Sequence, residues 1–177
     1  MKKLLILAAG FGFFAVTAMA QSGPVVEIHA VSSTEAVHAD SHVKVAVVAK
    51  IASGYHINDH KPSLEYLIPT KFVPEPSGDF TVKDIVYPKG TPVKLSFSDS
   101  PLSVYQGSVI VGVELQSAKS LKPGNYQLKA KFAYQACSDH ACLAPASVPV
   151  VLTLKVVPDS VPLKATEPDV FKRIKFD

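Results

Sequence analysis

The residues of this sequence best suited to chemistry lie in one short stretch, residues 134–145. Cys137 and Cys142 are the only cysteines among the 177 residues, and four residues separate them. Thiols at this spacing can close an intramolecular disulfide, exchange that disulfide with another protein, or bind a metal. We therefore expect the function to depend on this stretch and the rest of the chain to position it.

The first twenty residues indicate the compartment in which these thiols work. Two lysines precede an apolar run over residues 4–16, and a small-x-small sequence ending at Ala20 follows, which is typical of a secretory signal peptide. We expect cleavage after Ala20, with residues 1–20 removed; the alternative is an uncleaved anchor. No later run approaches the roughly 18 apolar residues of a membrane helix, so we expect a periplasmic or secreted mature chain without stable membrane insertion. Cysteines of an exported chain are normally oxidised, which favours a Cys137–Cys142 disulfide.

Composition narrows the classes of partner. The formal net charge is only +3, and the 18 Lys and Arg residues are scattered along the chain. This pattern argues against a nucleic-acid interface and against a polybasic membrane patch, so we expect protein partners. About 155 residues remain after the signal, which is enough for one domain with a substantial core.

Alternation with a period of two, rather than helical periodicity, runs through the chain from Pro24. It is clearest in residues 43–51, 126–136 and 148–156, where apolar side chains share one face and polar ones the other. Further strands are predicted over residues 25–31, 65–72, 80–87, 93–97 and 104–115, separated by turns rich in Gly and Pro. No segment has the pattern of an amphipathic helix. The sequence therefore predicts an all-β, immunoglobulin-like antiparallel β-sandwich.

This domain is expected to cover residues 21–157, with residues 158–177 as a C-terminal tail. Alternation is lost after Val157, and the tail is expected to be extended. Its apolar side chains are the ones that would pack on the domain: Val170, Phe171, Ile174 and Phe176.

The two cysteines are predicted to sit opposite each other in a hairpin whose loop is residues 138–141. Directly opposite Cβ atoms lie about 4.5–5.5 Å apart, slightly wider than a disulfide prefers, so some strain is expected. Alternation places Cys137 on the solvent side with Lys131 and Gln135, within reach of a partner thiol. Because the closed loop is so short, the chain-entropy model gives the disulfide a contribution of only about 2 kcal/mol to the free energy of unfolding. This is little for a disulfide whose role is to stabilise the fold.

These observations leave three interpretations open. The first is a redox-active disulfide that exchanges with protein partners. The second is a binding or scaffold module in which the disulfide is purely structural, and the third is a metal-binding exported protein that uses the thiolates with His56, His60, Asp59 and His140. The spacing of these residues matches no standard metal motif, so no metal ligand is predicted.

Residues 134–145, followed by Val148-Pro149, closely resemble the active-site hairpin of the N-terminal periplasmic domain of the thiol:disulfide interchange protein DsbD. The resemblance extends over nearly all of the mature chain, because shorter matching pieces occur upstream in the family's order: Gly54-Tyr55-His56-Ile57-Asn58, Tyr87-Pro88-Lys89-Gly90 and Val104-Tyr105-Gln106-Gly107. The Tyr-Gln-x-Cys hairpin is its specific part.

The resemblance implies an immunoglobulin-like domain that acts as a protein-disulfide reductase component without a bound cofactor. Cys137 and Cys142 would be the exchanging, catalytic pair, with Cys142 attacked first. The implied partners are a membrane electron transporter, which donates electrons, and periplasmic thioredoxin-like proteins, which accept them. Because these 177 residues contain neither a membrane-spanning nor a thioredoxin-like domain, the donor is expected in a separate chain.

The sequence departs from the family in two places. Some members have five residues between the cysteines rather than four, so the loop shape need not carry over. The family also covers its cysteines with an aromatic-bearing cap loop, and the matching residues 97–101 keep only Phe97, which is the candidate lid. Other candidate neighbours of the redox site are Tyr55, His56, Tyr134, Asp139 and His140, although the tyrosines also suit a core and the loop residues suit any exposed loop tip.

Overall fold

The computed structural model describes residues 23–176. The predicted signal peptide and its cleavage site lie outside these residues. Within the described part, no helix is long and apolar enough to cross a membrane. The prediction of an all-β antiparallel fold is confirmed, since a single short helix accompanies eleven strands in this part of the chain.

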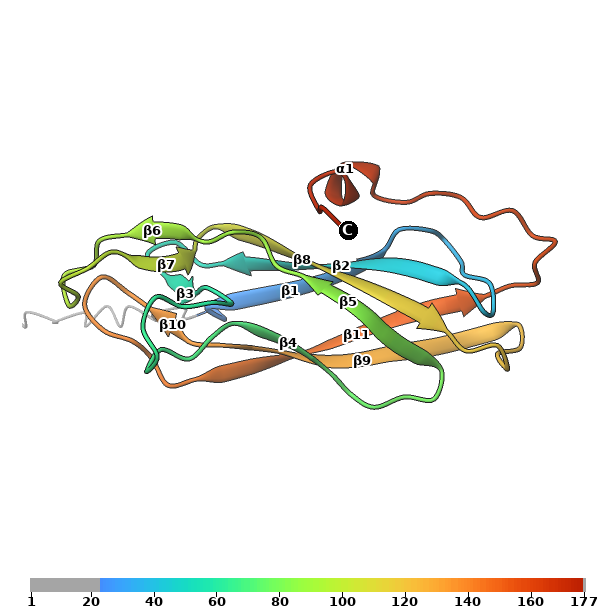
Figure 1. Cartoon of the computed structure of the whole chain (residues 1–177), viewed down its shortest axis with the longest axis horizontal. Coiled ribbons are helices and arrows are strands. Elements are labelled where there is room, and N and C mark those ends of the chain that lie inside the picture. The colour runs from blue at the N-terminus through green and yellow to red at the C-terminus, as the bar shows by residue number, and fades with distance from the viewer. Residues whose placement is uncertain (1–22, 177) are drawn as a thin grey trace, which may run out of the picture.

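Two antiparallel sheets form the sandwich (Figure 1). One sheet has the order β1-β2-β8-β5 and the other the order β11-β9-β4. The bounds of these strands are β1 Val26–Ser32, β2 His42–Ile51, β4 Lys71–Pro74, β5 Phe80–Val86, β8 Ser108–Ser117, β9 Gly124–Tyr134 and β11 Ala146–Val156. The chain thus crosses between the sheets several times, as in immunoglobulin-like sandwiches.

The core lies between the two sheets and follows the predicted alternation. Val45 and Val47 of β2 and Val113 of β8 are fully buried, and Leu128 and Phe132 of β9 are buried opposite them. Strand β9 pairs along its whole length with β11, from Tyr134 opposite Ala146 to Gly124 opposite Val156. This long pair carries the cysteine hairpin at its end.

A third, smaller sheet caps one end of the sandwich, at the left in Figure 1. Its order is β10-β3-β7-β6, with bounds β10 Ala136–Cys137, β3 His56–Asn58, β7 Leu102–Tyr105 and β6 Thr91–Val93. A separate apolar cluster of Leu67, Leu95, Leu102 and Val104 lies beneath it. This end of the molecule brings together the cysteines, the 59–70 loop and the segment around Phe97.

Three predicted strands differ from the observed ones. The predicted strand 104–115 is two strands, β7 and β8, because the chain turns at Gly107, whose φ of 66° a side chain rarely adopts. The predicted strand 65–72 is mostly loop, with β4 starting only at Lys71, and the predicted strand 93–97 is replaced by β6 and a turn. In the last two cases the apolar residues Leu67 and Leu95 are buried in the end cluster instead of in a ladder.

The C-terminal tail packs on the sandwich. After β11 it returns over the β1-β2-β8-β5 sheet, where helix α1, Pro168–Phe171, lies above β2 and β8 (Figure 1). Thr34 and Ala165 form an isolated antiparallel bridge. Ile174 and Phe176 lie directly over Gly112 of β8, where no side chain occupies the space. Ile174 and Phe176, two of the four apolar tail residues expected to pack on the domain, therefore do so. They lie so close to β8 that a side chain at position 112 would collide with them.

Candidate functional site

Cys137 and Cys142 form a disulfide at the tip of the β9–β11 hairpin. Their Cα atoms are 3.9 Å apart, and the two residues form an antiparallel bridge. The amide of Ser138 donates to the carbonyl oxygen of Ala141 at 2.9 Å, and the amide of Leu143 donates to that of Ala136 at 2.8 Å. The predicted disulfide and the four-residue loop are therefore present in the structure.

The prediction that Cys137 faces solvent is wrong. Cys137 is 1% exposed, whereas Cys142 is exposed. The alternation that holds through Tyr134 is broken at Gln135, because the chain leaves β9 there and Ala136 and Cys137 pair instead with β3 of the end sheet. Both residues of β10 are buried as a result. The disulfide is thus asymmetric, and a partner has access to it from the side of Cys142.

His56 lies directly opposite Cys137. The two residues are Cα partners in the β3–β10 ladder, and His56 is 2% exposed. Burial lowers the pKa of His56 below its usual value of 6.5, and the negative charge of Asp139 opposes this shift in part. The imidazole is therefore held mainly neutral near pH 7.

An open cleft of about 460 Å³ reaches His56 from the surface. Tyr55, Gln106 and Asp139 are among the residues that line it. Asp139 is exposed in the hairpin loop, and Tyr55 is half-buried. Three of the predicted neighbours of the redox site, Tyr55, His56 and Asp139, therefore share one cleft.

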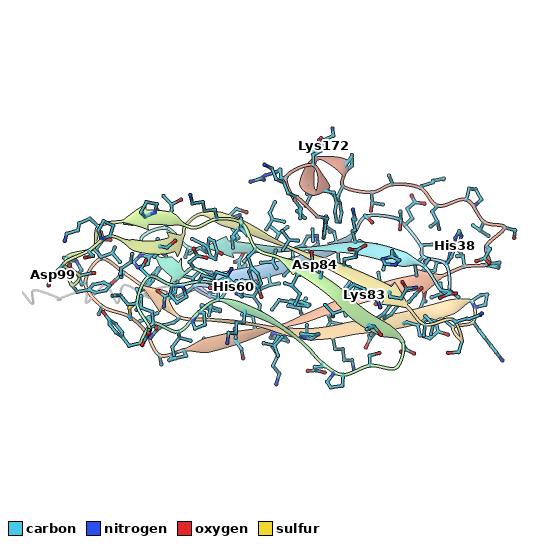
Figure 2. All side chains as sticks on the ribbon, viewed as in Figure 1. His38, His60, Lys83, Asp84, Asp99 and Lys172 are labelled. Carbon is cyan, nitrogen blue, oxygen red and sulfur yellow. A yellow bond between two sulfur atoms is a disulfide. The ribbon has the colours of Figure 1, made fainter. Side chains whose placement is uncertain are left out.

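The segment that carries Phe97 contacts the hairpin tip. The Ser96 hydroxyl donates a hydrogen bond to the backbone carbonyl oxygen of Asp139. Phe97 itself is 42% exposed. Figure 2 shows Asp99, two residues further on, at the end of the molecule where β6, β7 and β10 lie. The segment therefore has the location that a lid over the cysteines needs, and its role as a lid stays a prediction.

Gln135 is a residue that the sequence pattern misplaced. Alternation predicted it on the solvent face, but its side chain links both sides of the hairpin. Its Nε2 donates to the Leu143 carbonyl oxygen at 3.2 Å, while its Oε1 accepts from Asn58 Nδ2 at 3.2 Å and from the Ile68 amide at 3.5 Å. The one sequence feature that pointed to a special role for Gln135 was its place in the Tyr-Gln-x-Cys motif. Gln135 thus joins the hairpin to β3 and to the 59–70 loop.

A second polar network fixes the chain just after β3. Asp59 accepts hydrogen bonds from the Tyr105 hydroxyl at 2.6 Å and from the Ser103 hydroxyl at 2.7 Å. Burial alone would raise the pKa of Asp59, but these hydrogen bonds and those from nearby backbone amides outweigh it and lower the pKa below 3.8. Burial and the Asp59 hydrogen bond raise the pKa of Tyr105. The network anchors β3 to β7 and so fixes the position of His56.

The remaining candidates lie in different surroundings. Tyr134 is 7% exposed and belongs to the main core, where burial raises its pKa. His140 is exposed at the loop tip. His60 stacks on Tyr87 with ring centroids 3.7 Å apart, and Figure 2 places it well away from Asp99. Among residues 23–176, no three His, Cys, Asp or Glu side chains are grouped so that they could hold a metal ion.

Comparison with known families gives one match over most of the chain. The sequence model of the family described as thiol:disulfide interchange protein DsbD, N-terminal, matches residues 25–153, which include both cysteines and end before the tail. No curated protein sequence matches significantly.

Three solved structures resemble this chain at low sequence identity. The N-terminal periplasmic domain of ScsB from Proteus mirabilis is 16% identical with a TM-score of 0.50, over 76% of this chain and 48% of that one. This chain therefore spans about half of that structure, and the likeness concerns the fold alone. The DsbD N-terminal domain of Neisseria meningitidis in the reduced form is 19% identical, with a TM-score of 0.43, over 72% of this chain and 85% of that one. The complex of the DsbD and PilB N-terminal domains from Neisseria meningitidis is 20% identical, with a TM-score of 0.39. The match covers 68% of this chain and 80% of that one.

Proposed function

The chain belongs to the family of DsbD N-terminal domains, and we propose that it carries reducing equivalents between protein partners through Cys137 and Cys142. The observation that carries this proposal is the asymmetry of the disulfide at the hairpin tip. Cys142 is exposed to a partner, whereas Cys137 is buried beside His56. A disulfide with one reachable sulfur suits ordered exchange, in which one cysteine meets the partner and the other resolves the intermediate.

The exchange is a pair of thiolate displacements. When the oxidised protein receives electrons, a donor thiolate attacks Cys142 Sγ, the Cys137–Cys142 bond breaks, and its electron pair leaves on Cys137 Sγ. A second donor thiolate then attacks the donor sulfur of the mixed disulfide and releases Cys142 as a thiolate. The donor pair is oxidised to a disulfide, and the two cysteines are reduced. The same steps in reverse pass the electrons to an acceptor disulfide.

The surface around Cys142 supports a protein as the partner. Several large apolar side chains are exposed there: Leu143 follows Cys142 and is 43% exposed, and Ile68 is 41% exposed. Gln135 binds the backbone of both residues, so they lie on neighbouring segments. Tyr66, in the same loop as Ile68, is 74% exposed. Exposed apolar groups beside a reactive sulfur are typical of a transient protein interface.

The partners in this proposal are the ones that the family resemblance implies. The donor is a membrane electron transporter, and the acceptors are thioredoxin-like proteins of the periplasm. The signal-like pattern of the first twenty residues supports the periplasm as the compartment. The cysteines need no bound cofactor for this chemistry.

A transfer experiment tests the proposal. The reduced mature protein is mixed with the oxidised form of a thioredoxin, used as a probe acceptor with a Cys-x-x-Cys site, and the thiols of both proteins are counted after alkylation. We expect the disulfide to move onto Cys137 and Cys142. A Cys137→Ser variant should accumulate a covalent complex through Cys142, because the resolving thiol is missing.

The matched control is Cys142→Ser, which leaves only the buried thiol and should trap little complex. If wild-type protein stays reduced and Cys137→Ser forms no complex, the exchange function is refuted and the disulfide is structural.

A further inference from the structure

His56 and Cys137 share one side of the β3–β10 ladder. They are direct partners across an antiparallel pair, and Cβ atoms in such a pair lie about 4.5–5.5 Å apart on the same face. Both residues are almost completely buried, at 2% and 1% exposure. The pairing of two short strands thus places the two side chains on the same buried face of the ladder.

The Nε2 atom of His56 has no hydrogen-bond partner among residues 23–176. Buried side-chain nitrogens are nearly always paired, so an unpaired one calls for an explanation. The structure holds the disulfide form, in which Cys137 carries no proton. Reduction gives Cys137 an S–H group, which is a donor that the unpaired nitrogen can accept.

The groups around His56 favour a neutral imidazole that can take up a proton. Tyr55 from the turn before β3, Gln106 from the turn after β7 and Asp139 from the hairpin loop line the cleft that reaches it, and no lysine or arginine of the described chain does. Burial lowers the pKa of His56, and the carboxylate of Asp139 limits that shift. An imidazolium formed here would be stabilised by Asp139 and could release its proton through the open cleft.

We propose that His56 is the base that accepts the thiol proton of Cys137 when the reduced protein resolves a mixed disulfide. This inference rests on the proposed exchange function. Cys137 Sγ attacks Cys142 Sγ, which is joined to the partner's sulfur, and the proton of Cys137 passes to Nε2 of His56. The bond between Cys142 and the partner breaks, and its electron pair leaves on the partner's sulfur. The two cysteines are oxidised, the partner is reduced, and His56 then returns its proton to solvent.

The test separates the two steps by using glutathione disulfide as the oxidant. Reduced mature protein is mixed with it and quenched by rapid alkylation, and mass spectrometry distinguishes the glutathione adduct from the closed disulfide. For wild-type protein, the resolution rate should follow a sigmoid with its midpoint below pH 6.5. His56→Gln should slow resolution at pH 7 by about tenfold or more, with a rate that keeps rising toward the ordinary thiol pKa of about 8.5. Adduct formation at the exposed Cys142 should change little.

The matched control is His29→Gln, an exposed histidine of β1, which should leave both steps unchanged. Asp139→Asn is a second variant that does not disturb the core, because Asp139 is exposed and its backbone carbonyl keeps the Ser96 contact. Loss of its charge should move the midpoint of resolution to lower pH.

Resolution by His56→Gln at the wild-type rate and with the wild-type profile would overturn the inference. Should that variant fail to fold, an unmoved midpoint in Asp139→Asn would overturn it equally. A wild-type protein that never forms the adduct would instead refute the exchange function itself, and with it this inference.

Discussion

Cys142 is exposed at the tip of the hairpin, whereas Cys137, to which it is bonded, is 1% exposed. Attack on a disulfide requires the incoming thiolate to reach the target sulfur along the bond axis, and only the side of Cys142 is open to a protein-sized nucleophile. We therefore expect Cys142 to be attacked first, which is also the order that the family resemblance implies.

The asymmetry predicts different thiol reactivities. In a Cys137→Ser variant the free Cys142 should react with iodoacetamide about tenfold or more faster at pH 8 than the free Cys137 in a Cys142→Ser variant, because reactivity requires exposure as well as thiolate. Alkylation rates measured by mass spectrometry check this. Equal rates in the two folded variants would mean that the buried position of Cys137 is not maintained without the disulfide.

Phe97 is predicted to restrict access to the cysteines. Its segment is bound to the hairpin through the Ser96 hydroxyl and the carbonyl oxygen of Asp139. Phe97→Ala should accelerate alkylation of the reduced pair severalfold, and Ser96→Ala should act in the same direction because it frees the segment. Thr153→Ala, on the exposed face of β11, is the control. An alkylation rate unaffected by Phe97→Ala would eliminate the lid.

Gln135 is predicted to hold the hairpin against the 59–70 loop. Gln135→Ala removes one donor and one acceptor, which leaves the groups on Asn58, Ile68 and Leu143 without this partner. The free energy of unfolding should fall by about 1–3 kcal/mol. Gln127→Ala, on the exposed face of β9, should change it by less than about 0.5 kcal/mol. Urea unfolding of both variants gives the comparison, and equal losses would assign Gln135 no special role.

The C-terminal tail is predicted to be part of the folded unit rather than an appendage. A Cβ atom at position 112 would collide with Ile174 and would lie 2.8 Å from the Phe176 ring. Gly112→Ala should therefore destabilise the protein by about 1–3 kcal/mol, as overpacking does. Gly78→Ala, which meets no atom within 4 Å, is the control. In a chain that ends at Val157, the same Gly112→Ala change should lower the free energy of unfolding much less. An equal loss in the shortened chain would show that the new methyl group does not collide with the tail.

The sequence was informative wherever a strand stayed within one sheet. Alternation in β2, β9 and β11 predicted which side chains are buried, since Leu128, Ala130 and Phe132 lie in the core as expected. It failed at Gln135 and Cys137 because the chain leaves β9 there and joins the end sheet, while Ala136 keeps the core position that alternation predicts. A period of two carries no information about such a change.

The disulfide between the two cysteines could be predicted from the sequence, but the residues packed around it could not. The spacing of Cys137 and Cys142 was sufficient to predict their disulfide and the loop between them. Their relation to His56 was not, because strand β3 has only three residues and its pairing with β10 joins segments about eighty residues apart. Contacts set by pairing over such distances are not encoded in local periodicity, so the sequence offered His56 as a candidate neighbour without its pairing to Cys137.

The reduction potential of the Cys137–Cys142 pair tests the central claim most directly. The purified mature protein is equilibrated in glutathione and dithiothreitol buffers of defined potential, and free thiols are counted by alkylation. A disulfide that exchanges with thioredoxin-like partners should have a midpoint in their range, above about −300 mV. A midpoint well below about −300 mV would mark a structural bridge and would contradict the account.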